Sequence, residues 1–252
     1  MTDSIYTPPS ANLTIDNETG ASKAGGSLET GVLGEYTFTI GDVRREAWRL
    51  VKGNKGAIWL ATIVLSVIYL IAGKVLAMLG VPDGSKEMAS GSVLLGYGIA
   101  TFKGLLLIPV TAPLMAGFYL LCIKRVVGIP ASINELFAHF DKLPNLILIS
   151  LISAVMVYIG FALLVLPGIY LSLAYAFAVP LMIDKKLTPW QSLEASRKAV
   201  THNWFKVLGL GLLLYLILIL SMFTVVGIIW TVPMCMLAYG VLYRTIFGVS
   251  AV

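Results

Sequence analysis

The sequence predicts an all-α, polytopic membrane protein with about six transmembrane helices. Of its 252 residues, 58% are hydrophobic and only 12% are charged, and the mean hydropathy is +0.89. Roughly a quarter of the residues of an ordinary soluble domain are charged, so this chain has too little charge to cover a soluble surface. Six apolar stretches approach the length of about 20 residues that a helix needs to cross a bilayer. They cover residues 57–73, 104–123, 144–166, 168–183, 204–224 and 227–247.

The chain opens with a stretch that lacks any periodic apolar pattern. Residues 1–34 contain scattered Pro, Gly, Ser and Thr and no apolar run. Such a composition cannot bury enough apolar surface to fold, so we predict a flexible N-terminal tail, followed by a six-helix transmembrane domain at 35–252. The tail has no basic region followed by an apolar core, and therefore does not match a secretory signal.

The basic residues predict the orientation of the spans. All 18 lysines and arginines except Lys74, Lys86 and Lys103 fall in segments that share one side if six spans alternate across the bilayer. By the positive-inside rule that side is cytoplasmic, so both termini are expected there. Lys74 and Lys103 each lie about 30 Å along a helix from the nearest cytoplasmic basic cluster, so their side chains would reach the outer interface of the membrane. The alternative for Lys103 is an intramembrane cation that binds an anionic substrate.

A short pattern occurs three times along the chain. A hydroxyl residue is followed three residues later by Asp, Glu or Gln, and then by a partly apolar turn, an Asn and a span. The pairs are Thr39 and Asp42, Ser132 and Glu135, and Thr188 and Gln191. Each pair matches or approximates a capping box at a helix N-terminus. We therefore predict three tandem units, each an interfacial amphipathic helix plus a helical pair, at about 39–131, 132–187 and 188–252. Within the first unit, residues 93–99 are interpreted as an interfacial or re-entrant segment.

Two of the predicted interfacial helices carry basic side chains opposite an apolar stripe. These residues are Arg44, Arg45 and Arg49 on the first helix and Arg197 and Lys198 on the third. A basic amphipathic helix suits contact with anionic headgroups of the inner leaflet, while packing within a cytoplasmic cap is the alternative. We expect anionic membrane lipids as partners and leave a protein partner or a homo-oligomer open. Nucleic acid is not expected, because the basic residues flank apolar segments and form no stripe with interleaved aromatic side chains.

The sequence contains no pattern that predicts catalysis, a cofactor or a metal. His139 and His202 lie on separate predicted helices, and no group of His, Cys or carboxylate residues has the spacing of metal ligands. Cys122 and Cys235 lie in apolar runs, where a small buried side chain is the usual role. The chain also lacks phosphate-loop, nucleophile-elbow and dinucleotide motifs, so we expect it not to be an enzyme.

Several motifs resemble a known family. They are the segments PLMAGFY at 113–119, LPGIYL at 166–171 and PL at 180–181, with Leu193, Ser196 and NW at 203–204. Together they resemble a family of bacterial six-helix membrane proteins of unknown function, similar to the membrane domain attached to some glycerophosphodiester phosphodiesterases. The resemblance covers about 39–248 and implies a location in the bacterial cytoplasmic (inner) membrane. It implies no particular activity, and the phosphodiesterase domain has no counterpart in this chain.

Two functional hypotheses follow. The first is a non-enzymatic inner-membrane protein that organises lipid or docks a partner through its basic cytoplasmic face. The second is an uncoupled channel or carrier for a small or lipidic molecule, lined by spans that contain possible helix breaks at Pro109, Pro113, Pro180 and Pro233. A coupled carrier is disfavoured because the predicted spans hold no acidic residue at mid-membrane depth.

Overall fold

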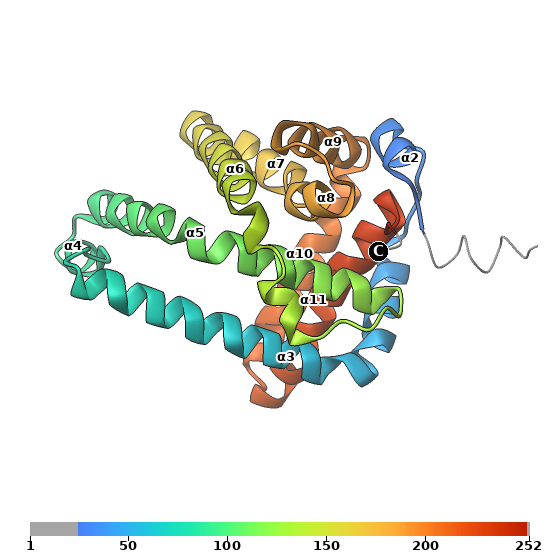
Figure 1. The fold of residues 1–252 in the computed structure, drawn as a ribbon, viewed down its shortest axis with the longest axis horizontal. Coiled ribbons are helices and arrows are strands. Elements are labelled where there is room, and N and C mark those ends of the chain that lie inside the picture. Colours follow the sequence, from blue (N-terminus) through green and yellow to red (C-terminus); the bar gives the residue numbers. More distant parts are fainter. Residues whose placement is uncertain (1–24, 251–252) are drawn as a thin grey trace, which may run out of the picture.

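The computed structural model of the protein describes residues 25–250, and within this range the chain folds into helices without any strand (Figure 1). The helices are α2 (Leu28–Leu33), α3 (Ile40–Met78), α4 (Ser85–Ala89), α5 (Val93–Val126), α6 (Leu143–Leu163), α7 (Val165–Ala174), α8 (Ala178–Asp184), α9 (Pro189–His202), α10 (Trp204–Met222) and α11 (Val225–Phe247). Two 3-10 helices, η1 (Ile133–Phe137) and η2 (Phe140–Lys142), precede α6. Six helical segments are long and apolar enough to cross a membrane, which confirms the predicted all-helical class with six candidate spans.

The end of the predicted tail is folded. Residues 28–33 form α2, whose N-terminus is closed by reciprocal hydrogen bonds between Ser27 and Thr30. Gly31 is buried, and the Gly26 amide donates to the Arg244 carbonyl at 3.0 Å. A helix of six residues gives almost no periodic signal, so the sequence alone predicts it as part of the tail. Residues 1–24 of that predicted tail lie outside the described residues.

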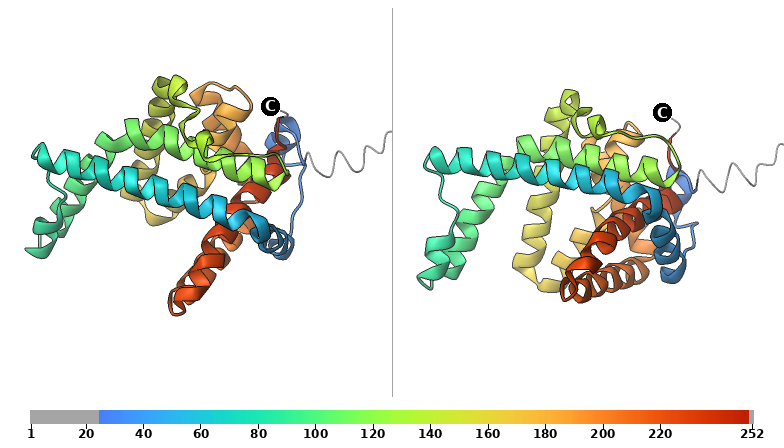
Figure 2. Two further views of the ribbon diagram at one scale, coloured as in Figure 1. Left: turned by 60° about the horizontal axis from the view of Figure 1, so that its bottom comes forward. Right: turned by 90° about the horizontal axis from the view of Figure 1, so that it is seen from below.

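Helix α3 bends where its polar beginning meets its apolar remainder. Lys52 and Gly53 depart from helical geometry, and Gly53 has a φ of 98°, which favours glycine. Figure 2 shows the first turns of α3 running across the direction of its long second part. The bend lets Val43, Ala47 and Val51 bury their side chains while the rest of the helix follows a different axis.

Helix α5 lies at the centre of the bundle and contacts α3, α11 and η1. One close approach depends on Gly117, because a methyl group there would overlap the Glu135 carbonyl and come within 2.6 Å of Leu136 Cα. At their far ends α3 and α5 project together beyond the other helices and are joined through α4 (Figure 1). Residues 93–99, interpreted above as an interfacial or re-entrant segment, are the first turns of α5.

The fourth apolar segment is interrupted between α7 and α8. Pro180 has no N–H to donate to the Ala176 carbonyl four residues earlier, and the Tyr239 hydroxyl donates to that carbonyl instead, at 2.8 Å. Ser196 on α9 donates to the Ala174 carbonyl at 2.6 Å and accepts from the Phe177 amide at 3.3 Å. Side chains of two other helices therefore satisfy the backbone groups exposed by the break.

The three repeated caps differ in the structure. Thr39 accepts from the Asp42 amide, and Thr188 forms a full capping box with Gln191. The second copy is the exception, since the Ser132 side chain makes no capping hydrogen bond and the segment forms η1 and η2 in place of an amphipathic α-helix. The Glu135 side chain, expected to cap this helix, is instead paired with Lys124.

Candidate functional site

The first candidate site is a basic surface on the opening turns of α3. Arg44, Arg45 and Arg49 are exposed on the face opposite the buried Val43 stripe. Trp48, which is 50% exposed, lies among them. We call Arg44, Arg45, Trp48 and Arg49 the α3 basic surface. Arg45 pairs with Asp42 at 3.4 Å, whereas Arg44 and Arg49 have no carboxylate within 4.0 Å among residues 25–250.

The predicted basic residues of α9 are partly neutralised. Arg197 Nη2 and Lys198 Nζ lie 3.2 Å and 3.1 Å from the same Glu194 Oε1. The hydrogen bond from Lys198 lowers the pKa of Glu194, so this acid is ionised at neutral pH and offsets part of the local positive charge. An exposed indole, Trp190, stands two turns before these residues. The α9 face therefore resembles the α3 basic surface but carries less net charge.

The two basic segments pack in different parts of the molecule. The first turns of α3 belong to a helix that packs on α11 and α5, whereas α9 packs on α8, α7, α6 and α2. The structure thus does not merge the predicted basic residues into one continuous patch. The α3 basic surface is the stronger anionic-ligand candidate of the two.

The four prolines of the channel hypothesis occupy different environments. Helix α5 continues through Pro109 and Pro113, and α11 continues through Pro233. Pro109 is exposed, while Pro113, Pro180 and Pro233 are buried. Of the four, only Pro180 adjoins a break in an apolar helix, and the carbonyl of Ala176 at that break is hydrogen-bonded. At Pro180, therefore, the Ala176 carbonyl that the proline leaves without a helical donor is already hydrogen-bonded.

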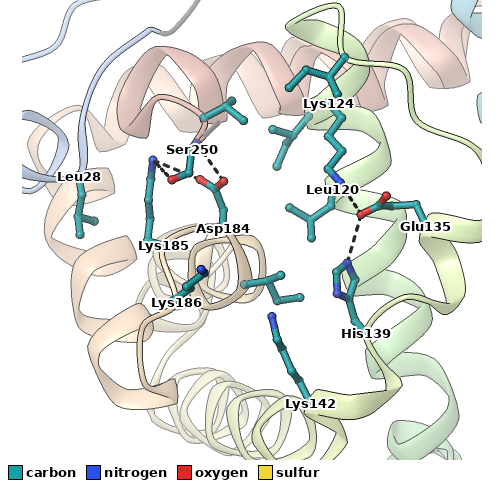
Figure 3. A pocket seen from close by; sticks show the side chains of 14 residues that line it. Leu28, Leu120, Lys124, Glu135, His139, Lys142, Asp184, Lys185, Lys186 and Ser250 are labelled. Atoms are coloured by element: carbon teal, nitrogen blue, oxygen red, sulfur yellow. Dashed lines mark hydrogen bonds and ion pairs between the residues drawn. The ribbon is translucent and has the colours of Figure 1, made fainter. Parts of the chain in front are cut away.

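The structure also shows a site that sequence reasoning missed. A cavity of about 530 Å³ opens between the C-terminal end of α5, η1 and η2, the C-terminal end of α8 and the segment after α11 (Figure 3). We call it the lysine pocket. Its lining residues are Leu28, Leu120, Ile123, Lys124, Ile129, Glu135, His139, Lys142, Ile183, Asp184, Lys185, Lys186, Val249 and Ser250.

One side of the lysine pocket is organised around Glu135. Lys124 Nζ lies 2.9 Å from Glu135 Oε1, and the buried His139 places Nε2 3.4 Å from the same oxygen. Gly117 permits this arrangement, because it allows the backbone of η1 to rest directly on α5. The Glu135 carboxylate therefore neutralises the positive charge of Lys124.

The opposite side of the lysine pocket is organised around Asp184. This buried carboxylate accepts from the Tyr243 hydroxyl at 2.8 Å and from the Ser250 amide at 3.1 Å, and it pairs with Lys185 at 3.2 Å. Lys185 also reaches the Ser250 hydroxyl at 3.2 Å. Asp184 thus ties α8 to α11 and to the chain that follows α11.

In the sequence, the lysines that line this pocket indicate only topology. Lys124, Lys142 and Lys186 come from separate segments, and no spacing rule relates them. The available signal was Asp184, an acidic residue at the very end of an apolar segment. Such a residue needs partners when it is buried, and two of those partners, Lys185 and Ser250, line the pocket.

No protein-family model, curated protein or solved structure matches this chain. The resemblance to bacterial six-helix membrane proteins stays a prediction.

Proposed function

We propose that this protein is a non-enzymatic, multi-pass protein of the bacterial inner membrane that gathers anionic lipid at its cytoplasmic face through the α3 basic surface. The observation that carries the proposal is the exposure of Arg44 and Arg49 beside Trp48, without a carboxylate partner in the described part of the chain. An indole prefers the boundary between headgroups and acyl chains, and guanidinium groups form strong hydrogen bonds with phosphate oxygens.

The proposal includes an orientation with both termini in the cytoplasm. The positive-inside rule supports it, and so does the gathering of basic groups from α5, η2 and the residues that follow α8 around the lysine pocket. It also includes an origin of the fold in three tandem units. Two observations support that origin, namely the hydroxyl caps at Thr39 and Thr188, each at the start of a helix that buries an apolar face.

Lipid analysis of purified protein tests the function. Each basic residue near an anionic surface contributes about 1 kcal/mol, so replacing Arg44, Arg45 and Arg49 by Gln should reduce the enrichment of anionic over zwitterionic lipid by about tenfold or more. The matched control replaces Lys74, Lys86 and Lys103 by Gln, which removes the same charge from the segments predicted to lie outside.

Mass spectrometry of co-purified lipid gives the measurement. The proposal requires that the arginine variant loses anionic lipid while the lysine control retains it. Equal enrichment in all three proteins would show that the α3 basic surface is not the lipid site. If the arginine variant instead loses an acidic protein partner while its lipid enrichment is unchanged, the α3 basic surface binds that partner and not lipid.

A further inference from the structure

The lysine pocket has the form of a ligand site. Its volume of about 530 Å³ falls within the range of roughly 300–1,000 Å³ that small-molecule sites occupy. Leu120, Ile123 and Ile183 give it an apolar floor of buried side chains. Charged side chains from three separate segments, namely α5, η1 with η2, and the end of α8, surround the cavity (Figure 3). The pocket can therefore receive a molecule with one charged end and one apolar part.

The charges of the lysine pocket do not cancel. Glu135 is paired with Lys124, and Asp184 is paired with Lys185. Lys142 and Lys186 also line the cavity, but neither has a carboxylate within 4.0 Å among residues 25–250. Two ammonium groups therefore remain available to an anion.

The backbone at Lys186 supports a role beyond packing. Lys186 has a φ of 53° and is the sole residue other than glycine, in the part of the chain that the structure describes, with a positive φ. Glycine adopts this conformation without the steric cost that a side chain adds. Residues held in this way gather at binding and catalytic sites. A lysine at this position is explained if its charge is needed in the pocket.

We propose that the lysine pocket binds a phosphate monoester, with Lys142 and Lys186 as the cations that hold the phosphate group and the apolar floor as the seat of the esterified group. A phosphate monoester carries about −1.5 to −2 charges at pH 7, which matches two unpaired lysines. The monoester can belong to a lipid headgroup or to a soluble molecule, since both present the same group. This site is separate from the α3 basic surface and does not rest on the function proposed above.

Two probes distinguish these sources. Phenyl phosphate, a soluble monoester, is titrated calorimetrically into the full-length protein in detergent, with benzoate as the carboxylate counterpart. Phosphatidic acid is presented in nanodiscs against phosphatidylcholine, and retained lipid is measured by native mass spectrometry. Binding of phenyl phosphate supports a soluble ligand, and selective retention of phosphatidic acid without it supports a lipid headgroup. Failure of both probes, or equal binding of benzoate, overturns the proposal.

Variants assign the binding to the two lysines. Replacing Lys142 and Lys186 by Gln should weaken binding by about tenfold or more, because hydrogen bonds to charged groups are lost. The control, Lys74→Gln with Lys86→Gln, removes the same charge at the other end of α3 and α5 and should bind as the native protein does. Replacing Arg44, Arg45 and Arg49 by Gln should also leave phenyl phosphate binding unchanged, which separates this site from the α3 basic surface.

A third variant removes misfolding as an explanation. Lys186→Gly suits the left-handed backbone, so the variant should unfold no more readily than the native protein and still bind at least about tenfold more weakly. Unchanged affinity in both Lys186→Gly and the double Gln variant would show that these lysines do not form the site.

Discussion

Arg244, near the end of α11, holds Glu46, in the opening turns of α3, through two hydrogen bonds. Nη1 lies 2.8 Å from Oε1 and Nη2 lies 2.9 Å from Oε2. The two residues are 198 positions apart in the chain, so this pair joins the first candidate span to the last. The Arg244 side chain is 14% exposed and the Glu46 side chain 35% exposed. A paired arrangement of this kind fixes orientation as well as distance.

The first prediction concerns this ion pair. Glu46→Gln should lower the free energy of unfolding by about 1–2 kcal/mol, because a charged hydrogen bond is weakened at a half-buried site and solvent screens part of it. Arg45→Gln is the control, since it removes an exposed pair with Asp42 and should change stability by about 0.5 kcal/mol or less. Unfolding titrations with denaturing detergent in mixed micelles give both values. Equal losses would show that the Arg244 pair contributes no more than a surface pair.

The second prediction concerns the contact between α5 and η1. Gly117→Ala should destabilise the protein by about 1–3 kcal/mol, because the added methyl would overlap the backbone of Glu135 and Leu136. Gly104→Ala, in the same helix, has no atom within 4 Å of its added methyl and should be neutral or stabilising by up to about 1 kcal/mol. Thermal unfolding of both variants decides the point, and similar stabilities would mean that η1 does not rest on α5.

The third prediction compares two copies of the repeated cap. The Thr188 side chain accepts a hydrogen bond from the Gln191 amide and forms a capping box, whereas the Ser132 side chain makes no capping hydrogen bond. Thr188→Ala should therefore cost about 1 kcal/mol of unfolding free energy. Ser132→Ala should stay within about 0.5 kcal/mol of the native protein. An equal cost in the two variants would contradict the difference between these turns.

These comparisons show where sequence reasoning succeeds. The candidate spans were predictable because apolar length is a local property that needs no knowledge of neighbours. The Thr188 cap was predictable for the same reason, since its partner Gln191 lies three residues away. The sequence also marks Pro180 as a possible helix break, and the break between α7 and α8 lies just before it. Its hydrogen-bond partners were not predictable, because Ser196 and Tyr239 come from other helices.

The candidate sites divide in the same way. Exposure of Arg44 and Arg49 followed from the helical period of the apolar stripe around Val43. The lysine pocket did not follow from any pattern, because packing alone decides that Lys142 and Lys186 line the same cavity. The pairing of Lys124 with Glu135 could not be predicted either, because in the sequence Glu135 fits a capping box that the chain does not form.

The fourth prediction concerns orientation. A cysteine at Lys86, which is exposed in α4, should react with a membrane-impermeant thiol reagent applied to intact cells, because α4 is predicted to face outward. Cysteines at Asn134 or Thr188, also exposed, should react only after the membrane is permeabilised. Protein without an introduced cysteine measures the background from Cys122 and Cys235. Labelling at Asn134 and Thr188 from outside, with none at Lys86, would invert the topology.

The interrupted fourth segment also has a consequence for the order of biogenesis. The Ala176 carbonyl receives its hydrogen bond from Tyr239, 63 residues later in the chain, so α7 and α8 are synthesised before their partner. An unpaired carbonyl in hydrocarbon costs several kcal/mol. Until α11 is made, α7 and α8 lack this partner for the Ala176 carbonyl. The fourth candidate span therefore completes its hydrogen bonds only when the sixth is in place, and a chain that stops before Tyr239 leaves the Ala176 carbonyl without this donor.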